Sequence, residues 1–484
     1  MDPTMFNGLM GIWKGFFDNV MAEPAIFIGC ISLVGYILLR RPAHECFAGF
    51  IKTTVGFYIL LVGSGGLVNN FRPILAGLAE RFHMKAAVID PYFGWNAVTG
   101  AFAKAGWTTS LIMMALLIAF LWNILLVAFR PYTKIRTLFL TGHVMIQQAN
   151  TSLWMIFIAI PALQNNVWGI VACGIMLGTY WAVFSNLTLE PTQELTEGAG
   201  FAVGHQQMAA IWLTAKLAPK IGDRKTSVEH LNLPGFLKVF NDNVVAASTL
   251  MLIFFGTILY ILGPEYLAAR KFYNPASGEW FFKYVFKTTI HFAVYLFILQ
   301  SGVRMFVAEL TNSFQGISER LLKGSLPAID CAATYGFDKA GGNSVLFGFV
   351  CGAIGQFVAI MGLIVFQSPI MIITGFVPVF FDNATLGVFA NRFGGLRALV
   401  IICCSCGVLQ VLGGALAAGL TGLYEFGGYH GNIDWDTLWT FNAWMFQVFG
   451  LPSIVVLTLL MLAIPQIQYR RNRATYFTHG AASE

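Results

Sequence analysis

Long apolar runs separated by short polar breaks recur along the whole 484-residue chain. Hydrophobic residues make up 57% of the sequence and charged residues only 11%, whereas about 25% charged residues is typical of soluble domains. A helix that crosses a bilayer needs roughly 20 mostly apolar residues. Because so few charges cannot form a water-facing surface, the sequence predicts an all-α integral membrane protein.

The apolar runs indicate about eleven transmembrane helices, at residues 24–39, 49–68, 108–129, 151–164, 167–186, 243–263, 285–303, 344–366, 369–381, 397–420 and 442–465. The runs at 151–164 and 369–381 are short and lie beside polar stretches that contain Gly or Pro. They predict half-helices or re-entrant segments, which a membrane protein tolerates where they line a cavity.

Basic residues flank the apolar runs unevenly. The densest groups are Arg40 and Arg41; Lys216, Lys220, Arg224 and Lys225; and Arg470, Arg471 and Arg473. The positive-inside rule places these groups in the cytoplasm. We therefore expect an inner-membrane protein with a periplasmic N-terminus and a cytoplasmic C-terminus, which agrees with an odd number of spans. This asymmetry accounts for the net charge of +6 without any nucleic-acid partner.

Two stretches of the sequence match each other without gaps at an offset of 224 residues: Gly11, Lys14, Phe16, Asp18, Asn19, Val20 and Ala22 recur as Gly235, Lys238, Phe240, Asp242, Asn243, Val244 and Ala246. Further on, Ile89-Asp90 matches Ile329-Asp330, and Thr141-Gly142 matches Thr374-Gly375. The matches predict a first half at 1–225, a second, inverted half at 226–440, and a last span with a cytoplasmic tail at 441–484. Shared membrane composition is the alternative explanation.

One polar group lies among apolar residues at Thr141, Gly142, His143, Gln147 and Gln148. Polar groups in a membrane are expensive, so they usually face a cavity or a partner. In a helix, His143 and Gln147 lie on one face, where they suit a polyhydroxylated ligand. A hydrogen bond between two helices would explain His143 equally well.

A second polar group follows Gly198, Gly200 and Gly204, whose glycines permit irregular backbone just before His205, Gln206 and Gln207. The preceding carboxylates Glu190, Glu194 and Glu197 have helical spacing after Pro191, which favours a turn. No histidine falls in register with them, so they indicate a solvated face or a gate rather than a metal site.

Asp90 and Asp330 are acids with apolar neighbours, and an unpaired acid in such surroundings needs a hydroxyl or basic partner. Asp90 precedes a proline and is equally compatible with a helix N-cap. Asp330 is the better candidate for contact with a ligand.

The sequence contains no visible machinery for energy coupling. It lacks the G-x-x-x-x-G-K-[ST] loop that binds ATP phosphates, so energy must come from an ion gradient or from a separate protein. Cys403, Cys404 and Cys406 lie in an apolar run with no histidine or carboxylate nearby, and we expect neither a metal site nor disulfides. The chain is therefore not expected to be an enzyme on its own.

Several longer motifs resemble those of one family: Leu140-Thr141-Gly142-His143 with Gln147-Gln148, Pro191-Thr192-Gln193-Glu194, Gly204-His205-Gln206-Gln207, the run from Gly302 to Leu310, and the run from Ala328 to Ala333. Over nearly the whole chain, the sequence resembles ascorbate-specific IIC permeases of the phosphoenolpyruvate-dependent phosphotransferase system. The related galactitol-type permeases are the family most easily mistaken for this one.

The resemblance implies an eleven-span homodimer whose protomers each have a substrate-binding core domain and a dimer-forming scaffold domain. It implies that substrate passes to a IIB protein, which itself works with a IIA protein. It also implies that L-ascorbate contacts Pro91, Tyr92, His143, Gln147, His205, Gln206 and Asp330. Pro91 departs from the family pattern, which has a threonine there, and proline offers only its carbonyl.

Ascorbate presents an ionised enediol ring and a hydroxylated tail. We therefore hypothesise that His143 and His205 donate hydrogen bonds to the ring and that Asp330 accepts from the tail. One alternative is an ion-coupled carrier of a related organic anion or polyol, with Asp330 and Glu309 as its titrating pair. A membrane enzyme acting on lipid is a third, for which we find no metal or paired-carboxylate motif.

Overall fold

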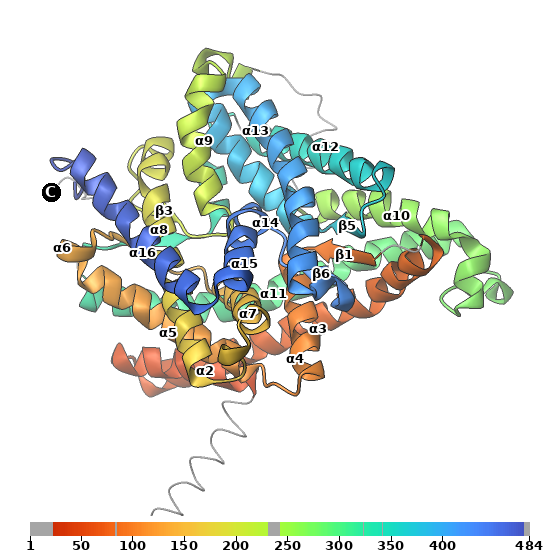
Figure 1. Ribbon diagram of the computed structural model, residues 1–484, viewed down its shortest axis with the longest axis horizontal. Coiled ribbons are helices and arrows are strands. Elements are labelled where there is room, and N and C mark those ends of the chain that lie inside the picture. Colours follow the sequence, from red (N-terminus) through yellow and green to blue (C-terminus); the bar gives the residue numbers. More distant parts are fainter. Residues whose placement is uncertain (1–22, 83–84, 231–242, 323, 341, 479–484) are drawn as a thin grey trace, which may run out of the picture.

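The computed structural model describes residues 23–82, 85–230, 243–322, 324–340 and 342–478 (Figure 1). Helices dominate it, which confirms the predicted class. Within the described residues, seven helical segments are long and apolar enough to cross a membrane: Ala43–Gly63, Ser110–Ala128, Val167–Thr196, Met251–Ala269, Asn343–Val365, Pro378–Thr421 and Leu451–Arg471. The count of eleven stays a prediction.

The helices in chain order are α2 (Pro24–Leu38), α3 (Ala43–Phe82), α4 (Pro91–Lys104), α5 (Ser110–Ala128), α6 (Arg130–Thr133), α7 (Gly142–Ala159), α8 (Val167–Thr196), α9 (Met208–Ile221), α10 (Asn243–Ala269), α11 (Phe281–Leu321), α12 (Asn343–Val365), α13 (Asn383–Thr421), α14 (Ile433–Asp436), α15 (Leu438–Phe449) and α16 (Leu451–Arg471). The helices α2, α3 and α11 pack on one another, and α9 and α12 each pack on α13. Figure 1 shows α2 and α3 along the lower edge and α9, α12 and α13 at the top.

The two short apolar runs are parts of longer elements. Residues 151–159 of the first run form the second part of α7, which already begins at Gly142, so His143 lies in the first turn of this helix. The run at 369–381 contains a strand and then a π-helical turn at Pro378–Asp382 that leads into α13. Neither run is a half-helix by itself, since the first belongs to α7 and the second leads from β5 (Ile370–Thr374) into α13. The re-entrant arrangement stays a prediction.

Pro191 does not end a helix, contrary to the turn expected there. It lies inside α8, which continues to Thr196, and its side chain is buried. A proline in a helix interior costs about 3 kcal/mol, but α8 packs against α5, α9 and α16 along its length. This tertiary packing outweighs the local preference.

The single span expected at 442–465 is two helices. α15 ends at Phe449 and α16 begins at Leu451, and Gly450 between them has a φ of 60°. The left-handed region is readily available only to glycine, so the chain changes direction at this residue.

Within the described part of the chain, six short strands that were not predicted from the sequence join distant segments: β1 (Lys85–Ile89), β2 (Thr137–Phe139), β3 (Ala202–Val203), β4 (Leu326–Ile329), β5 (Ile370–Thr374) and β6 (Gly428–Tyr429). They form two parallel sheets with strand orders β5-β1-β6 and β2-β4-β3. Within a membrane every backbone polar group needs an internal partner. The sheets provide such partners where the chain leaves its helices.

Most of the strongest internal match, at residues 11–22 and 235–242, lies outside the described residues. Within them, the matched acids have the same local structure, because each follows a strand and caps the next helical turn. Asp90 Oδ1 accepts from the Tyr92 N–H at 3.0 Å, and Asp330 Oδ1 accepts from the Ala332 N–H at 2.9 Å. The inverted relation of the two halves stays a prediction.

Candidate functional site

His143, His205 and Asp330 meet at one edge of the β2-β4-β3 sheet. Asp330 directly follows β4, His205 follows β3 by two residues, and His143 lies in the first turn of α7 after β2. Parallel strands bring their carboxyl ends to the same edge, so residues far apart in the sequence come together there. His143 Nε2 lies 3.4 Å from Asp330 Oδ2, and the two imidazole ring centroids are 5.9 Å apart.

The three side chains differ in accessibility. The side chain of Asp330 is 39% exposed and that of His143 is 17% exposed, while His205 is only 3% exposed. The cluster is therefore open on the side of Asp330 and closed behind His205. A ligand that reached it would meet the carboxylate first.

The orientation of His205 follows from its neighbour Gln207. The Gln207 Nε2 amide donates to Thr385 Oγ1 at 3.1 Å and to the Phe381 carbonyl at 3.3 Å, which leaves Gln207 Oε1 as an acceptor. His205 Nδ1 lies 2.7 Å from that oxygen and must donate to it. A neutral His205 therefore keeps its lone pair on Nε2. Only a protonated His205 can donate to a ligand, which restricts the hypothesis that both histidines donate.

Four further side chains form a one-directional hydrogen-bond relay. The Trp181 indole N–H can only donate, and it donates to Gln148 Oε1 at 2.6 Å. Gln148 Nε2 then donates to Gln206 Oε1 at 2.7 Å, and Gln206 Nε2 donates to Gln147 Oε1 at 2.8 Å. Because each amide is fixed in turn, Gln147 keeps its Nε2 hydrogens for another acceptor.

His430 supports this relay from the other half of the chain. Its Nε2 lies 2.9 Å from Gln206 Oε1 and its Nδ1 lies 2.8 Å from Thr151 Oγ1. Gln206 is completely buried and already engaged, so it orients Gln147 in this structure. Sequence reasoning missed His430 and Trp181. No local sequence signal marks either residue, because the short strand that precedes His430 is visible only in the structure.

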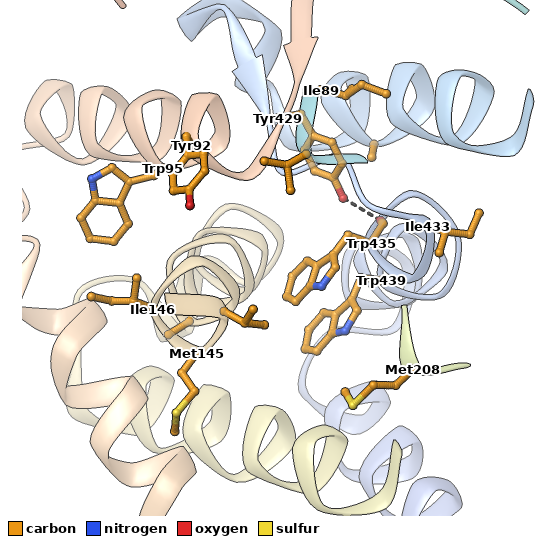
Figure 2. Packing of buried hydrophobic residues seen from close by; sticks show 14 of the residues in the cluster. Ile89, Tyr92, Trp95, Met145, Ile146, Met208, Tyr429, Ile433, Trp435 and Trp439 are labelled. Carbon is orange, nitrogen blue, oxygen red and sulfur yellow. Dashed lines mark hydrogen bonds between the residues drawn. The ribbon is translucent and has the colours of Figure 1, made fainter. Parts of the chain in front are cut away.

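A small hollow lies beside the polar cluster and joins Tyr92 to His143 and Gln147. Its remaining lining residues are Phe57, Leu60, Trp95 and Ile146. Figure 2 shows Tyr92 and Trp95 projecting from α4 toward the helix that carries Met145 and Ile146. Pro91, the first residue of α4, is buried. The structure thus places aromatic surface next to the histidine, amide and carboxylate groups.

Asp90 serves as the N-cap of α4, as one of its two interpretations predicted. Its other oxygen, Oδ2, accepts from the Val377 N–H at 3.2 Å, and its side chain is almost fully buried. Both carboxylate oxygens are therefore engaged by backbone groups.

The carboxylates at the end of α8 each meet a basic partner. Glu190 lies 3.8 Å from Arg136, Glu194 lies 2.9 Å from Arg224, and Glu197 pairs with Lys339 and Arg392. The hydrogen bond from Lys339 lowers the pKa of the Glu197 carboxyl. The pairs formed by Glu194 and Glu197 lie at an exposed charged surface, whereas Arg136 beside Glu190 is buried. The role of a gate stays a prediction.

Glu309 contacts α2 and α3 from its position on α11. Its carboxylate accepts from Tyr36 at 2.6 Å and from Lys52 at 3.0 Å. The Lys52 ammonium compensates the charge of Glu309, so nothing in these contacts favours a titrating pair with Asp330.

Residues 19–436 match the family described as EIIC-GAT, the PTS system sugar-specific permease component. The chain is also similar to a Mycoplasma pneumoniae protein named "Ascorbate-specific PTS system EIIC component", with 34% identity over 440 residues. This match covers 83% of the chain and 66% of the relative, which is just under two thirds of the relative's length. The chain therefore belongs to the family of sugar-specific membrane permease components of phosphotransferase systems.

Proposed function

We propose that this permease carries L-ascorbate into the cell and that a separate IIB protein phosphorylates it. The observation that carries the proposal is the convergence of His143, His205 and Asp330 beside the oriented amide of Gln147. The 34% identity to a protein named as ascorbate-specific supports the choice of substrate.

The site offers donors and acceptors that suit the two ends of ascorbate. The Gln147 amide donates toward the anionic enediol ring, and His143 joins it when Nε2 carries the proton. Asp330 can only accept when ionised, so it accepts from hydroxyls of the tail. His205 donates to the ring if it is protonated and otherwise accepts from a hydroxyl. Pro91 and Tyr92 complete the site from α4, where Tyr92 offers an aromatic face and Pro91 a carbonyl.

The larger architecture of the proposal follows the family. The halves at 1–225 and 226–440 are inverted repeats, 441–484 forms the last span and tail, and eleven spans place the C-terminus in the cytoplasm. Two protomers form a homodimer through their scaffold domains within the lipid bilayer. The pairing of β1 with β5 and of β2 with β4 supports this layout, since each pair joins one strand from each half.

The test is uptake of labelled L-ascorbate by cells that lack their own ascorbate transporter and express this chain with or without its IIB and IIA partners. Chromatography of the intracellular label identifies the product. We expect ascorbate phosphate only when the partners are present. Free ascorbate accumulating without them would overturn the coupling, and no uptake in either strain would overturn the substrate.

A galactitol-type polyol is the second candidate substrate, because Asp330 suits neutral hydroxyls as well as the tail of ascorbate. Competition separates the two: an excess of unlabelled galactitol leaves ascorbate uptake unchanged if the donors at Gln147 and His143 recognise an anion. An ion-coupled carrier would instead lose uptake when the ion gradient is collapsed.

A further inference from the structure

The cluster of His143, His205 and Asp330 has the composition and spacing of a transition-metal site. The three side chains each offer one ligand atom, and these atoms lie within 4.8 Å of one another. We propose that, in the substrate-free protein, these residues bind a divalent transition-metal ion such as Zn²⁺, and that the ion competes with the substrate. The competition rests on the proposed function, whereas the binding of the ion does not.

The donor set fits zinc in type and number. Zinc binds imidazole nitrogen and carboxylate oxygen at about 2.0–2.2 Å, and catalytic or exchangeable sites use three protein ligands and leave a fourth position open. Tetrahedral ligands at that distance are about 3.3 Å apart, and the gap of 3.4 Å between His143 Nε2 and Asp330 Oδ2 already meets this spacing. The widest separation among the three ligand atoms, at most 4.8 Å, would have to shorten when an ion binds.

His205 is held as metal-binding histidines usually are. Such histidines donate their second ring N–H to a fixed oxygen, which sets the tautomer and directs the other nitrogen at the metal. Here His205 donates Nδ1–H to Gln207 Oε1 at 2.7 Å, and Thr385 and the Phe381 carbonyl fix Gln207. The Nε2 lone pair is therefore set in advance. Loss of a supporting residue of this kind typically weakens metal binding 10- to 100-fold.

Calorimetric titration of buffered Zn²⁺ into the purified, substrate-free protein tests the site. We expect one strong site per chain, weakened at least tenfold by Asp330→Asn and by His205→Asn, and about tenfold by Gln207→Leu. His291→Asn is the matched control, since His291 lies on α11 outside the cluster, and it should leave the strong site unchanged. Equal binding in the wild type and in Asp330→Asn, or no strong site in the wild type, would overturn the proposal.

A variant that is expected to keep zinc binding distinguishes loss of the site from misfolding. Asp330→Cys supplies a thiolate, which is a good zinc ligand, so we expect it to bind Zn²⁺ at least as tightly as wild type while ascorbate binding falls at least tenfold. A protein that lost its fold would lose both. Weaker binding of both ligands to a variant of wild-type thermal stability would contradict the site.

Competition is measured by titrating ascorbate anaerobically with and without saturating Zn²⁺. We expect a rise in the apparent Kd for ascorbate with no change in stoichiometry. Ascorbate binding that is unaffected by bound Zn²⁺ would overturn the shared site. If Zn²⁺ binds through the cluster and ascorbate does not bind at all, the proposed substrate fails while the metal site stands.

Discussion

The acids that end β1 and β4 share a local structure and have different surroundings. Asp90 after β1 is buried, and its two oxygens accept from the N–H groups of Tyr92 and Val377. Asp330 after β4 also caps a helical turn, but its side chain is 39% exposed and its second oxygen faces His143. One acid therefore completes the fold, and the other is available to a ligand.

The surroundings of the two acids differ at the start of the helical segment that follows the neighbouring strand, β2 beside Asp330 and β5 beside Asp90. Thr141-Gly142 is followed by His143, whereas the matching Thr374-Gly375 is followed by Phe376. A Cβ atom on Gly375 would lie 2.4 Å from Asp90 Oδ2, so the chain passes close over that carboxylate and brings the next N–H groups within reach. Phe376 stacks on Phe380 with ring centroids 5.0 Å apart and turns an apolar side chain to its surroundings. Asp330 therefore has a histidine side chain as a neighbour, whereas the matching position beside Asp90 carries an apolar ring.

The largest effect expected on binding comes from Asp330→Asn. The variant removes a charge-assisted acceptor worth about 1.5–3 kcal/mol, so ascorbate affinity should fall about 10- to 150-fold. Calorimetric titration of the purified protein measures it. Glu194→Gln, a surface acid, is the control, and an affinity within twofold of wild type for Asp330→Asn would remove Asp330 from the site.

Asp90→Asn should instead reduce stability. Asparagine keeps one acceptor oxygen, so one of the two backbone N–H groups loses its partner, at a cost of about 1–3 kcal/mol in the free energy of unfolding. Thermal unfolding in detergent measures the loss, and the folded protein should bind ascorbate within about threefold of wild type. If the ascorbate affinity of Asp90→Asn fell as far as that of Asp330→Asn, the two acids would not have different roles.

Trp181→Phe tests the relay that orients Gln147. Without the indole N–H, the amides of Gln148, Gln206 and Gln147 are no longer held in one direction, and a lost hydrogen bond of about 1 kcal/mol predicts an affinity for ascorbate roughly fivefold lower. The preference for ascorbate over galactitol should also fall in this variant. A loss of packing alone would not reduce that preference. Trp168→Phe, which alters an exposed tryptophan, is the control. Unchanged discrimination would argue against the relay.

The smallest effects are expected for the matched hydroxyls of Thr141 and Thr374, which are both buried without a hydrogen-bond partner. Removing an unsatisfied polar group is close to neutral or stabilising, so Thr374→Val should change the midpoint of thermal unfolding by little or raise it. Thr141→Val lies beside His143 and should lower ascorbate affinity about threefold if the hydroxyl meets the ligand. If Thr141→Val and Thr374→Val bind ascorbate with equal affinity, Thr141 has no contact with the substrate.

The polar residues of the site were predictable because each is costly inside an apolar chain. His143, His205 and Asp330 stood out for that reason, and the structure brings them together. The irregular backbone before His205 was also predictable from the glycines in the sequence. In the structure, Gly198 and Gly200 adopt positive φ values of 96° and 78°. Trp181 and His430 were not predictable, because the hydrogen bond between His430 and Gln206 joins residues 224 positions apart. No local pattern encodes such a partner.

The sequence by itself determined the membrane environment, the family and the polar residues that can meet a ligand, because hydropathy and side-chain chemistry are local properties. Only the tertiary structure decided that short parallel strands bring three of these residues together at one edge. It also decided that both oxygens of Asp90 accept hydrogen bonds from backbone N–H groups, and that the amide hydrogens of Gln147 remain available to a ligand. These outcomes depend on pairing between distant segments. Hydrogen-bond direction and accessibility are set by that pairing, and neither can be read from the order of residues.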